Sequence, residues 1–121
     1  MNWEVEFHKD FYVEYLNFPD EVRIEILAKI RLLEMLGPTL NRPYVDTLNG
    51  SIYANMKKLR FHTIDCVWRV AFAFAFDPDR SAILLTAGDK AGENQKRFYQ
   101  QIIEVADRRF RDHLAQLKEK K

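Results

Sequence analysis

The sequence predicts a single α+β domain in which a helical hairpin packs on a small mixed β-sheet. Three patterns lead to this fold class. Residues 3–7 alternate apolar and acidic side chains with the period of a strand, and residues 20–36 carry an apolar stripe with the period of a helix. Residues 56–87 then hold three strand-like apolar runs, which a final amphipathic helix follows. The expected order of elements is therefore β-α-α-β-β-β-α.

A strand and two helices are expected in the first third of the chain. In WEVEF the apolar residues occupy every second position, which predicts a strand with one solvent-exposed face. Apolar residues at helical spacing follow from Asp10 until Pro19 closes this short segment. The acidic residues after Pro19 suit the start of a second helix. Gly37 and Pro38 end that helix, because glycine favours a helix C-terminus and proline cannot continue it.

The rest of the chain predicts a three-stranded meander and a long helix. Residues 38–55 contain two prolines and an Asn-Gly pair, so we expect an irregular connection there. NMKKLRFH, CVWRVAFAFAF and SAILLTAG form the three strands; the nearly continuous apolarity of the second indicates a central strand buried on both faces. The last helix starts at about Asn94 and ends in a Lys-rich tail that we expect to fray.

The composition fits one domain that spans residues 1–121. The single cysteine, Cys66, excludes an internal disulfide and fits a reducing compartment; we interpret it as a small core residue. The N-terminus is charged and alternating, unlike a signal peptide, and no apolar run reaches the roughly 18 residues that a membrane helix needs. We therefore expect a cytoplasmic protein without membrane contact.

Several familiar sites are absent from the sequence. GDKAG matches neither a phosphate-binding loop of Walker spacing nor a dinucleotide fingerprint. One cysteine and three scattered histidines, His8, His62 and His113, make no recognisable metal set, so neither a metal nor a cofactor is expected. His62 is open to two interpretations, as an acid/base residue or as an ordinary polar residue near a hairpin turn.

Cations on the predicted sheet are the main functional signal. Lys58 and Arg60 share one face of their strand by the period of two, whereas Lys57 belongs to the other face. Arg69 is the only charge in its apolar strand, and a charge that loses hydration needs a partner or a functional site. Two readings of Arg69 stay open: an ion pair with Asp65 or with a carboxylate of the acidic N-terminal half, or a functional cation.

The predicted meander brings further positive side chains to the same end of the sheet. The last strand delivers Lys90, and the last helix opens with Lys96, Arg97 and Tyr99. A sheet rimmed with Lys and Arg and lacking an obvious carboxylate suits a phosphodiester. RNA cleavage in such a place uses the 2′-hydroxyl as an internal nucleophile, so the protein has to align it, neutralise the phosphate and manage two protons.

Three stretches together resemble one known family. RPYVDTLNGSIYANMKKLRF, WRVAFAFAFDPDR and LLTAGDKAGENQKRFY are similar to the HigB-like, phage-derived branch of the RelE/ParE toxin superfamily, and the resemblance extends to about Leu114. It implies a microbial-RNase-like fold of the order given above. It also implies a toxin of a type II toxin–antitoxin system, specifically a metal-independent endoribonuclease that cuts mRNA on the ribosome. The implied partner is an antitoxin, typically a helix-turn-helix DNA-binding protein.

The resemblance also assigns roles to single residues. Arg60, Arg69, Lys90 and Tyr99 match positions at which the superfamily carries its catalytic residues, with Arg69 on the transition-state phosphate and Tyr99 supporting the site or stacking there. RNA- or phosphate-binding roles fall on a second set, Lys57, Lys58, Lys96 and Arg97. The general base stays open. Tyr99 has a structural alternative as a helix anchor in the core.

Two other functions compete with the nuclease. A ParE-like relative would inhibit DNA gyrase, although such chains generally lack the full set of cations on the sheet. A remnant that kept its fold and its antitoxin contacts would have no catalytic activity at all, because fold does not imply function.

Overall fold

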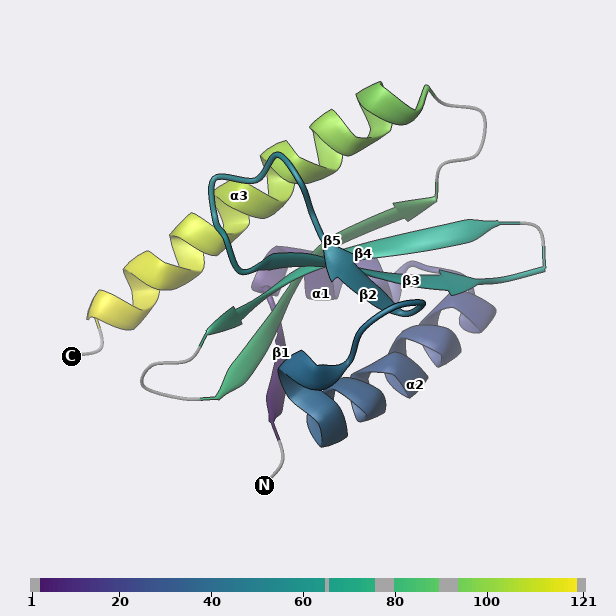
Figure 1. Cartoon of the computed structure of the whole chain (residues 1–121), viewed down its shortest axis with the longest axis horizontal. Coiled ribbons are helices and arrows are strands. Elements are labelled where there is room, and N and C mark those ends of the chain that lie inside the picture. The colour runs from purple at the N-terminus through teal and green to yellow at the C-terminus, as the bar shows by residue number, and fades with distance from the viewer. Residues whose placement is uncertain (1–2, 65, 76–79, 90–93, 120–121) are drawn as a thin grey trace.

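The computed structural model describes residues 3–64, 66–75, 80–89 and 94–119. They form a five-stranded sheet of strand order β1-β5-β4-β3-β2 with three helices (Figure 1). β1 pairs with β5 in parallel and the other neighbours are antiparallel, so the predicted mixed sheet and α+β class are confirmed. The elements are β1 Glu4–Phe7, α1 Lys9–Leu16, α2 Asp20–Leu36, a 3₁₀ turn Gly37–Thr39, β2 Val45–Thr47, β3 Met56–His62, β4 Val67–Ala75, β5 Ser81–Asp89 and α3 Gln95–Glu119.

The structure adds one short strand to the predicted order. β2 lies in the segment expected to be irregular and pairs antiparallel with β3 through three residues, Val45 to Thr47. Three residues are too few for an alternating pattern to stand out in the sequence. The strand is nevertheless anchored, because Val45 is buried and the Arg60 amide donates to the carbonyl of Tyr44 at 2.8 Å.

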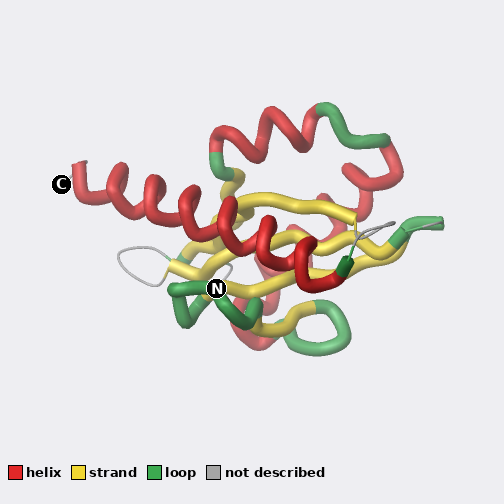
Figure 2. The backbone as a smooth tube through the Cα atoms, turned by 90° about the horizontal axis from the view of Figure 1, so that it is seen from above, coloured by secondary structure: helices red, strands yellow, loops and turns green. Residues whose placement is uncertain are grey.

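The two faces of the sheet bury different cores. α1 and α2 cover one face and α3 covers the other (Figures 1 and 2). In β4, which lies at the centre as predicted, Phe72 and Phe74 point towards α1 and α2, whereas Ala71 and Ala73 point towards α3. The alanines leave room for large side chains of α3, and each such buried side chain contributes about 1.5–3 kcal/mol. These α3 side chains are Phe98, Ile102 and Phe110.

The end of α2 is fixed against the start of the chain. Gly37 ends the helix with φ of 52°, a conformation that side chains disfavour, and a Cβ there would overlap the indole of Trp3. The Trp3 amide donates to the carbonyl of Glu34 at 2.8 Å, which joins the N-terminal segment to the last turn of the helix.

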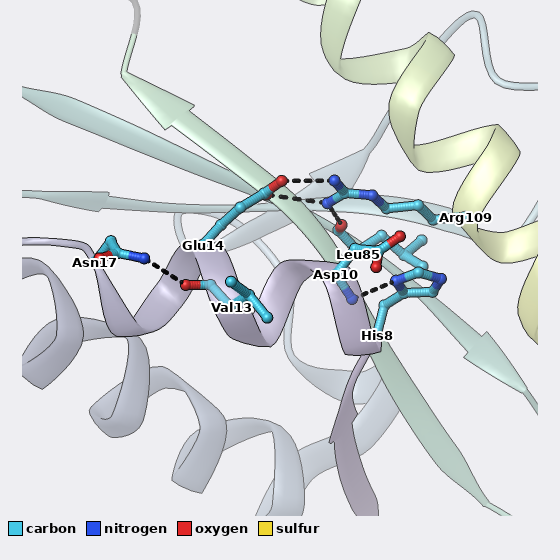
Figure 3. Close-up of polar contacts among 7 residues, drawn as sticks. All are labelled: His8, Asp10, Val13, Glu14, Asn17, Leu85 and Arg109. Atoms are coloured by element: carbon cyan, nitrogen blue, oxygen red, sulfur yellow. Dashed lines mark hydrogen bonds and ion pairs between the residues drawn. The ribbon is translucent and has the colours of Figure 1, made fainter.

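A partly buried ion pair fixes α3 to α1 (Figure 3). Arg109 donates to both carboxylate oxygens of Glu14 on α1, at 3.0 and 2.6 Å, and to the carbonyl of Leu85 at 2.8 Å. The β4–β5 register passes from Ala71–Thr86 to Phe72–Leu84, so it skips Leu85. The hydrogen bonds from Arg109 to Glu14 raise the pKa of Arg109 above its ordinary value. One guanidinium thus ties α3 to both α1 and β5.

Within the part of the chain that the structure describes, no helix is both long enough and apolar enough to cross a bilayer.

Candidate functional site

A cavity of about 360 Å³ opens where β2, β3 and β4 meet the start of α3. We call it the cationic cavity. Four of its lining residues are cations and one is a carboxylate. The residues that line it are Arg42, Pro43, Tyr44, Asp46, Lys58, Arg60, Arg69 and Tyr99.

The pleat of the sheet aims the strand cations into this cavity. Leu59 and Phe61 are buried in the core beneath α1 and α2, so Lys58 and Arg60 point to the opposite face, as the period of two predicts. Arg69 of β4 stands directly opposite Arg60 in the antiparallel pair. Like charges at directly opposite positions of an antiparallel pair are unfavourable for folding. The pairing concentrates positive charge on this part of the sheet.

Aromatic rings of α3 support the cations. The Lys58 Nζ lies 4.7 Å from the centre of the Tyr99 ring, and the Arg69 guanidinium lies 5.7 Å from the rings of both Phe98 and Tyr99. Gly88, the β5 neighbour of Arg69, makes the close approach of α3 possible: a Cβ there would stand 3.3 Å from the Phe98 ring. The rings hold the cations by cation–π attraction without neutralising them.

No carboxylate of the described residues forms an ion pair with Lys58, Arg60 or Arg69. The Arg69 Nη1 donates to the carbonyl of its neighbour Val67 at 3.3 Å. The alternative partner Asp65 lies outside the described residues. The guanidinium of Arg69 is therefore held in place by a backbone oxygen and two rings.

The expectation that nothing acidic lies at the site is wrong for Asp46. Its carboxylate lines the cationic cavity, accepts from the Thr47 amide at 2.8 Å and pairs with the Arg42 Nη2 at 2.9 Å. The Thr47 amide, and after it the Arg42 guanidinium, lower the pKa of Asp46 below its ordinary value. Asp46 is thus ionised near neutral pH and is engaged mainly with Arg42 on its own loop.

Four of the eight predicted site residues meet in the cationic cavity: Lys58, Arg60, Arg69 and Tyr99. Lys57 lies on the other face of the sheet, where its Nζ is 3.3 Å from the Thr47 hydroxyl. Lys96 and Arg97 are exposed on the first turn of α3, where their amides donate to the Asn94 side chain at 2.9 and 3.3 Å, and neither lines the cavity. Lys90 lies outside the described residues. The catalytic and RNA-binding roles of all eight stay predictions.

Sequence reasoning missed the part of the site that β2 and the residues just before it supply. Arg42, Tyr44 and Asp46 belong to RPYVD, a stretch that is part of the family resemblance but assigned no site residue. The available signal was a pair of opposite charges four residues apart around a proline and an aromatic residue. Their approach to Lys58 depends on the β2–β3 pairing, in which Asp46 stands opposite Lys58.

Across the described ranges, no group of three or more His, Cys, Asp or Glu side chains is placed to hold a metal ion.

Sequence comparison finds a family and two relatives for this chain. The family model described as "Phage derived protein Gp49-like (DUF891)" matches residues 14–111. HigB3 of Mycobacterium tuberculosis, named as a toxin, is 50% identical over 90 residues, which are 74% of this chain and 75% of that protein. HigB2 of the same organism, also named as a toxin, is 44% identical over 108 residues, or 88% of this chain and 53% of HigB2. The chain thus spans about half the length of HigB2.

Two solved structures have the same fold. The free Escherichia coli toxin RelE, solved as a mutant with two arginines replaced by alanine, superposes with a TM-score of 0.65 at 14% identity and covers 90% of this chain and 98% of its own. The archaeal RelE of a RelE–RelB complex from Pyrococcus horikoshii gives a TM-score of 0.56 at 18% identity, over 76% of this chain and 99% of its own. At such low identities the similarity shows the fold alone, which is the fold that the sequence predicted.

Proposed function

Because the chain belongs to the phage-derived Gp49-like protein family, we propose that it is the toxin of a toxin–antitoxin system and cleaves mRNA on the ribosome. The relatives named as toxins support the first part of this proposal. The observation that supports the second is the convergence of Lys58, Arg60 and Arg69 on one cavity without a carboxylate paired to any of them among the described residues.

The proposed cleavage begins when a phosphodiester enters the cationic cavity. The 2′-hydroxyl of the ribose loses its proton to a general base as its oxygen attacks the adjacent phosphorus, and the bond from phosphorus to the 5′-oxygen breaks. The departing 5′-oxygen takes up a proton from a general acid, which leaves a cyclic phosphate and a 5′-hydroxyl. Negative charge accumulates on the phosphate oxygens along the way, and fixed guanidinium groups stabilise that charge more than they stabilise the substrate. Arg60 and Arg69, which stand side by side, are the proposed source of this stabilisation. The nucleophile is internal, so the step needs no metal ion.

The proposed partner is an antitoxin encoded beside the toxin, of the helix-turn-helix DNA-binding class. The archaeal structure of the same fold is a complex of RelE with RelB, which supports a protein partner. Both helices of the hairpin also expose large apolar side chains, which suit a protein contact. They are Val13 and Leu16 on α1 and Ile24, Leu27 and Met35 on α2.

The test compares two single variants. Arg69→Gln changes the proposed site, and Arg31→Gln, which replaces an exposed arginine of α2, is the matched control. Induction of the wild type and of the control should arrest growth and produce new mRNA 5′ ends, and the adjacent gene product should restore growth. Arg69→Gln should reduce cleavage of ribosome-bound mRNA in vitro by about 100- to 1000-fold, the loss typical of one transition-state contact. Circular dichroism checks that each variant is folded.

The competing functions give different results in the same experiment. Growth arrest with intact mRNA and inhibited gyrase supercoiling would assign the chain to the gyrase inhibitors. No arrest and no cleavage by the wild type would leave a non-catalytic antitoxin-binding protein.

A further inference from the structure

A second cavity, of about 530 Å³, adjoins the cationic cavity. We call it the neighbouring cavity. The two share Pro43, Tyr44 and Arg60 on their linings, so a ligand chain that leaves one passes these three residues to reach the other. The rest of the lining comes from α2 and the end of β3: Glu25, Lys29, Phe61 and His62.

Tyr44 stands on the shared rim with a fixed backbone and an exposed ring. Its amide donates to the carbonyl of Asn41 at 3.0 Å, and its carbonyl accepts from the Arg60 amide at 2.8 Å. Tyr44 is nevertheless 44% exposed. A ring held by an ordered backbone loses little conformational freedom when a flat ligand stacks on it.

The chemistry of the neighbouring cavity differs from that of the cationic cavity. Its lysine, Lys29, is already 3.2 Å from the Glu25 carboxylate and 5.7 Å from the centre of the Tyr44 ring. Phe61, Pro43 and the imidazole of His62 supply flat or apolar surface. The cationic cavity therefore suits a phosphate, whereas the neighbouring cavity suits a planar ring with polar edges.

On the basis of the proposed function, we propose that the neighbouring cavity binds a base of single-stranded RNA next to the phosphate in the cationic cavity. Tyr44 is the stacking platform for that base. Arg60, which lines both cavities, holds the backbone between them. Stacking of a base on an aromatic side chain contributes about 1–3 kcal/mol and tolerates any base, because every base has a π-face.

The experiment measures binding and not cleavage, so it does not depend on catalysis. The probes are two labelled 2′-O-methyl hexanucleotides, one intact and one abasic at the central positions, titrated by fluorescence anisotropy. Tyr44→Ala should weaken binding of the intact probe by about 5- to 150-fold, the equivalent of one lost stack. The same variant should bind the abasic probe with the affinity of the wild type. Tyr44→Phe should stay within about 3-fold of the wild type, because it keeps the ring.

Two further variants complete the design. Tyr12→Ala removes a tyrosine of similar exposure, 47%, on α1 and should change the affinity for neither probe. Arg69→Gln should weaken the binding of both probes, because the proposed contact of Arg69 is to the phosphate, which both probes carry. A wild type that binds the intact probe in a Tyr44-dependent way but cuts no mRNA would refute the proposed nuclease and support the base site.

Three outcomes overturn the inference. The first is an unchanged affinity of Tyr44→Ala for the intact probe. The second is an equal loss of affinity for both probes, which would make Tyr44 a phosphate contact. The third is weaker binding of the adjacent-gene antitoxin with no change in RNA affinity, which would assign the cavity to a protein segment.

Discussion

Tyr99 contacts the cationic cavity through its ring. Lys58 lies over the ring face at 4.7 Å and the Arg69 guanidinium at 5.7 Å. An edge-to-face contact with Phe98, at 5.2 Å between ring centres, holds the ring at the start of α3. The two interpretations of Tyr99 from the sequence, a site residue and a helix anchor, are therefore compatible, because the same ring packs beside Phe98 and supports the cations.

We expect the ring of Tyr99 to matter more than its hydroxyl. Tyr99→Phe should keep mRNA cleavage within about 3-fold of the wild type, because the face that attracts the cations is retained. Tyr99→Ala should lower cleavage by about 2- to 30-fold, the equivalent of one cation–π contact. Cleavage of ribosome-bound mRNA measures both. Equal losses for the two variants would instead give the hydroxyl a proton-transfer role, for which losses of about 10²- to 10⁴-fold are typical.

At the residue scale, strand periodicity was sufficient to place the cations of β3 and β4. Lys58 and Arg60 had to share a face, and Arg69 lay on the next strand, so their meeting was predictable from spacing. Arg42 and Asp46 were not predictable in this way, because a three-residue strand brings them to the site and its pairing partner cannot be read from local sequence.

At the scale of elements, Arg109 links α3 to β5 and α1. Its position follows Ile102 and Ala106 at helical spacing, so it stands on the apolar stripe of the helix. A charge at such a position was the sequence signal for a buried partner, and sequence reasoning did not use it. The partner, Glu14, is 95 residues away along the chain and became visible only with the fold.

Removing either member of this ion pair should have unequal effects. The Arg109 side chain is 10% exposed and that of Glu14 is 42% exposed. Glu14→Ala removes the hydrogen-bonded counter-charge of a buried guanidinium, which keeps the Leu85 carbonyl as an acceptor, and should cost about 1–3 kcal/mol of unfolding free energy. Arg109→Met should cost less, because water can reach the remaining carboxylate and the methionine fills the space. Chemical denaturation measures both.

Glu104→Ala, an exposed change on the same helix, is the control and should shift the unfolding free energy by less than about 0.5 kcal/mol. A larger loss of unfolding free energy for Arg109→Met than for Glu14→Ala would contradict this explanation, in which the larger cost comes from a buried guanidinium without its carboxylate.

At the scale of the whole molecule, the sequence was sufficient for the fold class and most of the topology. The alternation of phenylalanine and alanine in β4 carries information about both layers, since the large residues face α1 and α2 and the small ones face α3. The β5 bulge at Leu85 and the short β2 could not be predicted, because both depend on pairing with distant segments.

Folding of the whole molecule should depend on the protonation of His8. Burial lowers the pKa of His8; Arg109 and Lys9 lower it further, whereas Asp10 and Asp112 oppose them. The unfolded chain titrates near 6.5 and the folded one below that value, so the unfolded state takes up the proton first as the pH falls. The contribution of His8 to stability is therefore complete above about pH 6.5 and is lost below it.

His8→Asn isolates this effect, because asparagine can still accept the Asp10 amide that the His8 Nδ1 accepts at 3.1 Å. As the pH is lowered from about 7.5 to 5, the unfolding free energy of the wild type should decrease relative to that of the variant. Urea denaturation at a series of pH values measures it. A difference that is constant over this range would show that His8 has the same pKa in both states.

The pairing of Arg60 with Arg69 places two positive charges opposite each other on adjacent strands. An empty site keeps two like charges together, and an anionic ligand between them removes the repulsion. Binding of such a ligand is therefore thermodynamically linked to folding, because a ligand that binds only the native state raises the population of the native state. We therefore expect a neutral substitution of either arginine to raise the unfolding free energy of the ligand-free protein and to weaken the proposed binding of an anionic ligand.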